Sequence, residues 1–345
     1  MSLVMEQSLD ASSNTVSQQS RIRTVQSIEP FVAEQLGLLK PVAESWQPSD
    51  FLPAFGAEGW RDEIGQLHHR AAQLSDELLV VLVGDLITEE ALPTYQTMLN
   101  RTDGLIDRTG VSDSPWAQWT RGWTAEENRH GDLLSKYLYL SGRISGRAVE
   151  TTIQHLLRNG FDPLTDNDPY RGLIYTAFQE RATRISHGNT ALLAAQSGDP
   201  VLAKICQMIA GDEARHEEAY KRFVRKILEV DPSGAITAFA QMMKARIAMP
   251  GRLMADGTGQ DLFGQFAAAA QRIGVYTLRD YGSIAEHLID YWGIGAASGL
   301  AGAATAAQDY LCGLPAFCRR AADRLDGALR AHPRVPCSWV FGRSV

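Results

Sequence analysis

Glu126-Glu127-Asn128-Arg129-His130 and Asp212-Glu213-Ala214-Arg215-His216 are two stretches of this chain that echo each other. Each contains Glu-x-x-His. Residues three apart lie on one face of an α-helix, one turn from each other. The Glu and the His of each stretch can therefore bind one metal ion together.

A single glutamate lies upstream of each pair. Glu89 precedes Glu127 by 38 residues, and Glu180 precedes Glu213 by 33. Each half of the region therefore predicts one helix with an inward Glu, followed by one helix with Glu-x-x-His. This is the layout of a carboxylate-bridged di-iron or di-manganese centre in a four-helix bundle. The predicted metal ligands are Glu89, Glu127, His130, Glu180, Glu213 and His216.

The charge of this ligand set favours the same interpretation. Four carboxylates at the centre of a bundle would be destabilising without positive charge beside them, and two divalent ions supply four positive charges. Neutral imidazoles add no charge and suit iron. The alternative is that these residues form solvated helix faces, since a single Glu-x-x-His occurs often by chance. Two such pairs, each with an upstream Glu, favour the metal centre.

The composition is that of a globular protein with one large or two modest domains. The chain has 345 residues, of which 45% are hydrophobic and 21% are charged. A net charge of −7 argues against a nucleic-acid partner. The longest apolar run, Leu78 to Val83, is too short to span a bilayer, so we do not expect a membrane-embedded protein. The four cysteines form no Cys-x-x-Cys pair and are expected to be reduced thiols.

The hydrophobic pattern predicts an all-α protein: a four-helix bundle extended by additional helices. Residues 1–20, rich in Ser and Gln and without the apolar core of a secretory signal, are expected to be disordered. Residues 21–345 are expected to form one helical domain, with the metal-binding bundle at about 61–230 and further helices at about 235–345. The first bundle helix is expected to run from Arg61 to Asn100, with Glu89 near its middle and a kink at Pro93. The other expected helices are 114–140, 146–159, 170–195 and 200–230.

Several stretches resemble a known enzyme family. They are residues 84–100 (GDLITEEALPTYQTMLN), 123–132 (WTAEENRHGD), 178–183 (FQERAT) and 212–217 (DEARHE). They are similar to the soluble acyl-acyl-carrier-protein desaturases, most of all to the plastid stearoyl-carrier-protein enzymes of plants. The resemblance runs from about Ser27 to the C-terminus, and its motifs are long enough to make chance a poor explanation.

The resemblance implies a fold and an activity. The fold would be ferritin-like. The activity would be conversion of a saturated acyl chain on acyl carrier protein into a cis-monoene in fatty acid biosynthesis, with O2 and two electrons from reduced ferredoxin. Stearoyl chains oxidised between carbons nine and ten are the expected substrate. It also implies two iron ions per chain, Fe2+ in the reduced state, and a homodimer. The compartment would be the plastid stroma in a plant or alga, or the cytoplasm in a bacterium.

Three further residues match positions that the family uses around its iron. Thr183 lies one turn after Glu180, where its hydroxyl could reach the oxygen side of the cluster; alternatively it hydrogen-bonds back to the helix. Asp212 matches a carboxylate that orients a ligating imidazole. Trp46 matches the same outer shell, although simple packing explains it equally well.

Other positions depart from the family pattern. Arg101 and Thr102 replace Thr and Leu near the acyl channel, Leu173 replaces an aromatic residue, and Glu44 replaces a Lys near the carrier-protein face. These departures concern chain length, double-bond position and carrier affinity rather than the metal centre. Towards the C-terminus lies a basic cluster that is either a solvated face or a docking patch for an acidic protein. It comprises Arg319, Arg320, Arg324, Arg330 and Arg334.

Two other classes of function remain open at this point. A non-catalytic, ferritin-like iron-binding bundle needs no acyl channel, and it leaves the helices after residue 231 unexplained. A related di-iron hydroxylase or N-oxygenase would use the same scaffold and differ in its product. A ribonucleotide-reductase-like radical role is disfavoured, because that subunit commonly has an Asp ligand and a radical Tyr.

Overall fold

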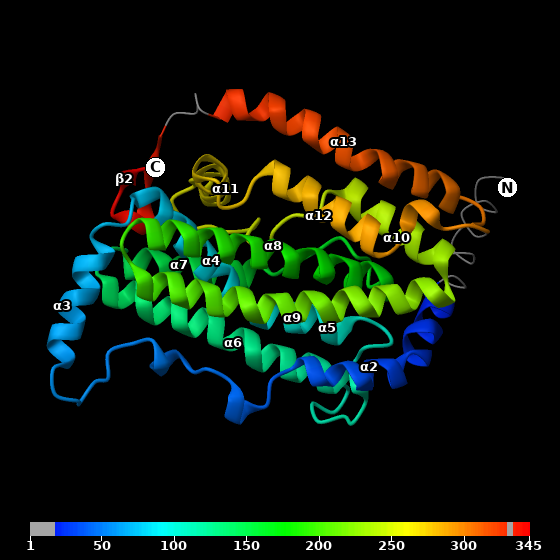
Figure 1. Cartoon of the computed structure of the whole chain (residues 1–345), viewed down its shortest axis with the longest axis horizontal. Coiled ribbons are helices and arrows are strands. Elements are labelled where there is room, and N and C mark those ends of the chain that lie inside the picture. The colour runs from blue at the N-terminus through cyan, green and yellow to red at the C-terminus, as the bar shows by residue number, and fades with distance from the viewer. Residues whose placement is uncertain (1–17, 330–333) are drawn as a thin grey trace.

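The computed structural model describes residues 18–329 and 334–345 and is mostly helical (Figure 1). Four long helices form the bundle, and two of them, α8 and α9, pack against each other more extensively than any other pair. The all-α prediction is confirmed. The bundle helices are α4 (Asp76–Glu90), α6 (Pro115–Ser141), α8 (Pro169–Gln196) and α9 (Pro200–Val230).

Three of these helices begin with the same local chemistry. Ser114, Asp168 and Asp199 each accept a hydrogen bond from an N–H of the first turn, at 2.9–3.2 Å. Each is followed by a proline, which has no N–H to leave unsatisfied at the first helical position. The expected start of the fourth bundle helix, with Asp199 as its cap, is therefore confirmed.

The expected helix from Arg61 to Asn100 is wrong, because the chain forms three helices there. They are α3 (Trp60–Ala71), α4 and α5 (Leu92–Arg101). Ser75 ends the first break by capping α4 at 3.2 Å from Leu78 N, and a second break falls at Ala91. Pro93 then lies in the first turn of α5, where its missing N–H costs nothing. Glu89 consequently lies in the last turn of α4, not in the middle of a long helix.

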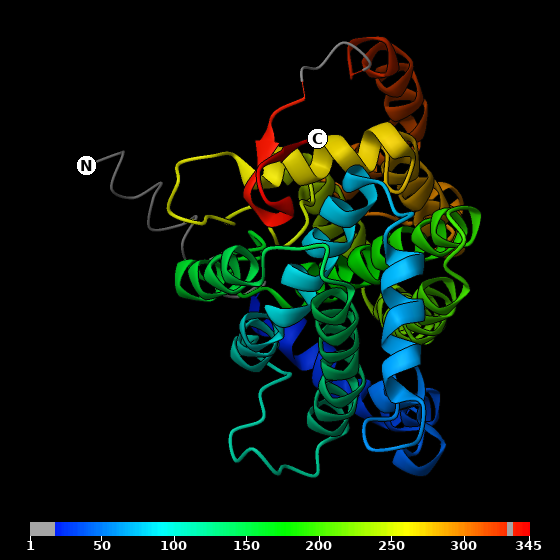
Figure 2. The ribbon, with the colours of Figure 1, turned by 90° about the vertical axis from the view of Figure 1, so that its left-hand side faces the viewer.

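The N-terminal part forms a lead-in along one side of the bundle. Residues 18–27 and α2 (Glu29–Gln35) are helical, and an extended stretch with three short 3-10 turns then runs to α3. Figures 1 and 2 both place this lead-in, in blue, on the opposite side of the bundle from α13. Of the segment expected to be disordered, residues 1–17 lie outside the described residues, and 18–20 belong to the first helix.

The C-terminal third covers the other side of the bundle (Figure 2). It adds α10 (Pro232–Ala245), α11 (Leu262–Ile273), α12 (Leu278–Tyr291) and α13 (Ala304–Leu329), while α7 (Gly146–Asn159) lies between α6 and α8 in sequence. The chain ends in a short antiparallel hairpin of β1 (Pro336–Cys337) and β2 (Arg343–Ser344), which the helical expectation missed. Within the described ranges, no helix has the length and apolar character needed to cross a bilayer.

Helix α4 is the buried centre of the fold. Every residue from Leu78 to Glu89 is buried, as expected for a helix that is apolar all round. Its Gly84 contacts Phe266 of α11 so closely that an added Cβ would lie 2.3 Å from the ring. At Gly131 of α6, a Cβ would lie 3.3 Å from Glu89. These small residues let α6 and α11 approach α4 closely, which fixes the position of Glu89.

Candidate metal centre

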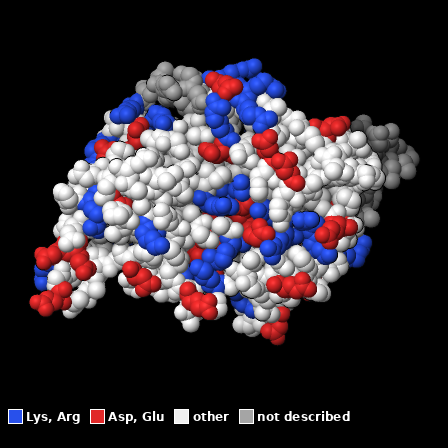
Figure 3. All heavy atoms as spheres, in the orientation of Figure 1, with Lys and Arg blue, Asp and Glu red and all other residues white. Residues whose placement is uncertain are grey.

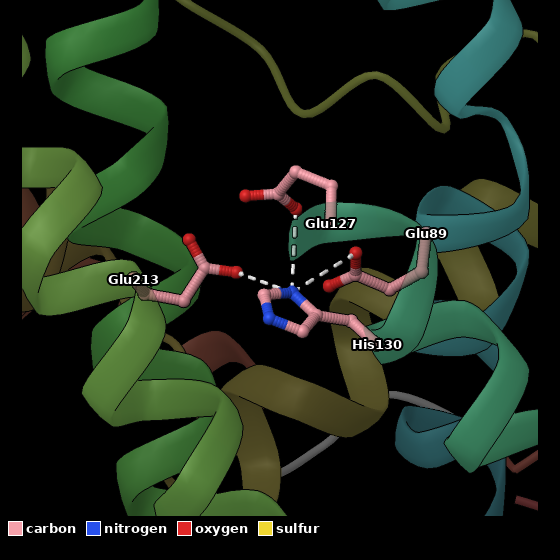
Figure 4. A group of neighbouring side chains, drawn as sticks. All are labelled: Glu89, Glu127, His130 and Glu213. Atoms are coloured by element: carbon pink, nitrogen blue, oxygen red, sulfur yellow. Dashed lines mark ion pairs between the residues drawn. The ribbon is translucent and has the colours of Figure 1, made fainter. Parts of the chain in front are cut away.

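The first group of candidate ligands surrounds the ring of His130 (Figure 4). Its Nδ1 atom lies 3.3 Å from Glu127 Oε2, 3.4 Å from Glu213 Oε1 and 3.8 Å from Glu89 Oε2. Three helices, α4, α6 and α9, supply these four side chains. One ligand atom from each lies within 4.8 Å of every other, a spacing that can enclose one metal ion.

A second group surrounds the ring of His216. Its Nδ1 atom lies 2.7 Å from Glu127 Oε1 and 3.5 Å from Glu180 Oε2, and Glu213 completes the group. Glu127 and Glu213 thus belong to both groups. They could therefore contribute to the binding of two ions, whereas Glu89 and Glu180 would each contribute to one. The six side chains singled out from the sequence are therefore the six that the fold brings together.

The side chains themselves fit a pair of cations. In the described residues, five buried atoms of the set make no well-formed hydrogen bond, although His216 Nδ1 and Glu127 Oε1 lie 2.7 Å apart. All five are possible metal ligands: Glu127 Oε1, His130 Nδ1, Glu180 Oε2, Glu213 Oε1 and His216 Nδ1. Buried polar atoms are normally paired. Burial also raises the pKa of Glu89 to about 7 and the pKa of Glu180 well above its ordinary value. Metal ions at the centre would give the unpaired atoms a partner and would stabilise the ionised form of both carboxylates.

The Nε2 atom of each imidazole lies near a carboxylate of the other histidine-bearing helix. Asp212 Oδ2 lies 3.5 Å from His130 Nε2, a position compatible with the orienting role that the resemblance implied. It also accepts a hydrogen bond from Trp46 Nε1 at 2.9 Å. Glu126 Oε2 lies 2.9 Å from His216 Nε2 in the same role. Glu126 was not among the residues predicted from the sequence. The signal was there, since an acidic residue directly precedes each shared glutamate.

Two more hydrogen bonds hold the glutamates that belong to one group only. His187 of α8, which is 1% exposed, lies with Nε2 3.1 Å from Glu89 Oε1. Trp123 of α6 donates its indole N–H to Glu180 Oε1 at 3.0 Å. Neither partner was predicted, although His187 follows Glu180 by seven residues and so lies on the same helix face. Both of these glutamates are thus oriented before any metal binds.

A mostly apolar cavity opens beside the ligands. Glu89, Glu127, Glu180 and Glu213 form one wall. The remaining wall is lined mainly by aromatic and methionine side chains, among them Tyr95, Met98, Trp123, Phe161, Tyr175 and Met249. This wall suits a hydrocarbon chain held next to the metal ions.

Comparisons with known proteins identify the family of this chain. The model of a family described as "Fatty acid desaturase" matches residues 20–341. The chain is 54% identical to stearoyl-[acyl-carrier-protein] 9-desaturase 1, chloroplastic, of Arabidopsis thaliana, over 94% of this chain and 83% of that protein. It is also 54% identical to an acyl-[acyl-carrier-protein] desaturase, chloroplastic, of Cucumis sativus, over 94% of this chain and 82% of that one.

The chain belongs to the acyl-[acyl-carrier-protein] desaturase family. A solved structure supports the fold: DesA2 of Mycobacterium tuberculosis H37Rv, a candidate acyl-ACP desaturase, matches with a TM-score of 0.50 and 20% identity, over 79% of this chain and 95% of that one. Acyl-ACP desaturases are di-iron oxidoreductases, and the two carboxylate–histidine groups fit two iron ions per chain.

Thr183 of this desaturase lines the cavity, but its hydroxyl is engaged elsewhere. It donates to the backbone carbonyls of Gln179 and Glu180, at 3.1 and 3.0 Å. This is the backbone-bonded alternative, so the expected reach towards the oxygen side of the cluster is not the arrangement in this structure. A role in catalysis would require the hydroxyl to rotate or to accept a hydrogen bond.

The departures from the family pattern fall at one end of the cavity or away from it. Arg101 and Thr102 line a groove beyond the cavity, and Met98 and Phe161 contribute to the walls of both. Thr102 is 2% exposed and donates to Met98 O at 3.0 Å, whereas Arg101 is exposed. Leu173 is buried in the core and Glu44 is exposed; neither lines the cavity.

Proposed function

We propose that this enzyme introduces a cis double bond into a saturated acyl chain carried on acyl carrier protein, using O2 and electrons from reduced ferredoxin. The observation that carries the proposal is the six-ligand centre opening on an apolar cavity. Stearoyl chains, oxidised between carbons nine and ten, are the proposed substrate, because two of the similar chloroplast proteins are named stearoyl-ACP 9-desaturases and are 54% identical to this chain.

The proposed reaction requires two roles of the protein: binding of the irons and placement of the acyl chain. Glu89, Glu127, His130, Glu180, Glu213 and His216 would hold the two irons. When bound, the irons supply the O2-derived oxidant that an unactivated methylene group requires. Hydrogen bonds from neighbouring side chains orient the ligands. The cavity places the acyl chain beside the metal centre and excludes bulk water from it.

The acyl chain is proposed to enter from the side of α11 and α12. A second hollow there is lined by Phe178, Phe263 and Tyr276, and it shares Gln179 and Met249 with the cavity beside the metal ligands. At the opposite end, Met98 and Phe161 separate that cavity from the groove at Arg101. In the proposed path, the acyl chain runs from this second hollow, the proposed mouth, past the metal ligands to an end wall at Met98 and Phe161.

Acyl carrier protein is proposed to dock beside this mouth on α13. Arg279, which follows the mouth residue Leu278, pairs with Asp323 of α13 at 2.7 Å. Arg320 and Arg324 lie exposed on the same helix, with no ion-pair partner among the described residues, whereas Arg319 already pairs with Glu286. Figure 3 shows basic side chains at this upper edge.

The basic cluster expected from the sequence is smaller in the structure. Arg334 forms an ion pair with Glu77 of α4 at 3.5 Å, so its charge is not available for docking. Arg330 lies outside the described residues. Because acyl carrier protein is acidic, reversing charge at Arg320 and Arg324 should raise the Michaelis constant at low salt, and less so at high salt. A matched reversal of exposed Arg147 and Arg158 on α7 should leave it unchanged; equal effects would place the docking face elsewhere.

Two further features are proposed from the family alone. The chain is expected to act as a homodimer, which sedimentation measures. Its compartment is expected to be the plastid stroma if the source is a plant or alga, in line with the chloroplast relatives, and the cytoplasm if it is bacterial.

One reconstitution tests the proposed function. The protein is loaded with iron anaerobically, mixed with acyl-carrier proteins of several chain lengths, reduced ferredoxin and O2, and its products are identified by mass spectrometry. A cis-monoene from stearoyl-ACP supports the proposal. A hydroxylated chain would instead identify a hydroxylase on the same scaffold, and iron uptake without any product would favour a storage role. Glu213→Ala, which lacks a ligand shared by both groups, serves as the iron-deficient control.

A further inference from the structure

Three tryptophans form a row on the face of α6 that leads to the metal ligands. Trp116, Trp119 and Trp123 are spaced by three and four residues, and the same face continues at Glu127 and His130. The three indoles are 1%, 1% and 5% exposed. The row therefore extends from the ligand centre into the core of the bundle.

Close ring contacts link this row to the centre. Trp123 lines the cavity and donates to Glu180 at 3.0 Å. The ring of Tyr220, one turn after His216 on α9, lies 6.4 Å from Trp123 and 5.8 Å from Trp119, measured between ring centroids. The ring of Phe223 contacts both Trp119 and Trp116, at centroid distances of 5.3 and 5.0 Å. An oxidisable ring thus adjoins the metal centre, with further rings behind it.

Packing alone does not account for these residue types. The indole N–H of Trp119 and the hydroxyl of Tyr220 are buried and lie beside each other; apart from this mutual contact, neither has a hydrogen-bond partner among the described residues. Phenylalanine or leucine would fill the same space without this cost, and unsatisfied buried groups are rare enough in proteins to need an explanation such as a redox role.

We propose that Trp123 and Trp119 form an electron reserve that protects the enzyme when O2 reacts while no acyl chain occupies the cavity. The proposal rests on the desaturase function given above. Reduction of O2 to two water molecules takes four electrons and four protons. In desaturation, two electrons come from ferredoxin and two, each with a proton, from the two C–H bonds.

Without an acyl chain, the two electrons of the C–H bonds are missing and have to be replaced. In the proposed reaction each of the two indoles gives one electron and becomes a radical cation, while solvent supplies all four protons. Two further electrons from reduced ferredoxin then restore the indoles. Tyr220 is not the donor, because its hydroxyl has no acceptor, among the residues that the structure describes, for the proton that a tyrosine loses on oxidation.

The test compares O2 reactions with and without substrate in the iron-loaded enzyme. The enzyme is reduced by ferredoxin, mixed with O2 without acyl carrier protein and frozen at intervals for electron paramagnetic resonance. We expect an indole radical, and its loss when stearoyl-ACP is bound first. Trp119→Phe should confine the signal to Trp123 and increase hydroxylated Trp123 peptides several-fold by mass spectrometry. Tyr220→Phe, which removes an unsatisfied hydroxyl, should leave the signal unchanged.

Trp339→Phe is the matched control, since this indole is fully buried but belongs to the C-terminal segment, and it should behave as wild type. The proposal is overturned by the absence of any organic radical while the optical spectrum of the iron shows that O2 has reacted. It is equally overturned by a tyrosyl signal that Tyr220→Phe abolishes, or by a Trp119→Phe enzyme identical to wild type. Alkene formation is measured separately, so failure of the proposed function is distinguishable from failure of the reserve.

Discussion

Replacing Glu89 by Gln should stabilise the metal-free protein at alkaline pH. Glu89 is buried, lies in the last turn of α4 and faces two other ligand carboxylates, those of Glu127 and Glu213. Without iron, the imidazoles of His130 and His187 favour its negative charge, but burial outweighs them and raises the pKa of Glu89. A glutamine side chain has the same shape. Its amide oxygen could still accept a hydrogen bond from His187 Nε2, which lies 3.1 Å from Glu89 Oε1.

The magnitude follows from the pKa of Glu89. Burial raises this pKa from 4.5 to about 7, so the native state retains a proton that the unfolded chain releases near pH 4.5. The free energy of unfolding therefore falls as pH rises from 4.5 to 7. At about 1.36 kcal/mol per unit, the loss is roughly 3 kcal/mol and is complete above pH 7. Glu89→Gln, always neutral, should recover most of it at pH 8 and almost none at pH 4.5.

Urea unfolding of the metal-free wild type and variant at pH 4.5 and pH 8 measures this difference. Glu229→Gln is the control, because Glu229 is exposed on α9 and pairs only with Lys226 at 2.7 Å among the described residues, so we expect a change within about 0.5 kcal/mol. The reasoning would be refuted if Glu89→Gln did not raise the free energy of unfolding at pH 8, or if it raised this free energy equally at both pH values. With iron present the order should reverse, since the variant loses a ligand.

Three further predictions concern the ligands and the channel. Glu213→Ala should remove iron from both positions, whereas Glu180→Ala should spare one, as read by metal analysis of the purified protein; full retention by both would contradict the ligand assignment. Asp212→Asn should weaken iron binding by about 10–100-fold in chelator competition, because it removes the charge behind His130, and unchanged affinity would show that the contact is incidental. Arg101→Thr with Thr102→Leu should alter chain-length preference or double-bond position, each methylene being worth ~1–3 kcal/mol in an apolar pocket. An unchanged product distribution would make these two residues surface variation.

The sequence determined the ligand set because the chemistry repeats at helical spacing. A Glu and a His three residues apart share a face in any α-helix, whatever the rest of the chain does. The paired acidic residues, the caps at Asp199 and Pro200 and the uniformly apolar α4 are equally local signals. The ligand helices were therefore predictable, apart from the breaks at Ser75 and Ala91. There a cap and a proline in the first turn of α5 outweighed continuous helical periodicity.

Only the tertiary structure decided how these faces meet. That Glu127 and Glu213 are shared, and that Glu126 orients His216 while His187 holds Glu89, depends on distances between helices far apart in the sequence. The cavity likewise forms where several helices and loops converge, and no local pattern encodes its end wall at Phe161. Spacing along one helix fixes which side chains share a face, but packing between helices fixes what that face touches.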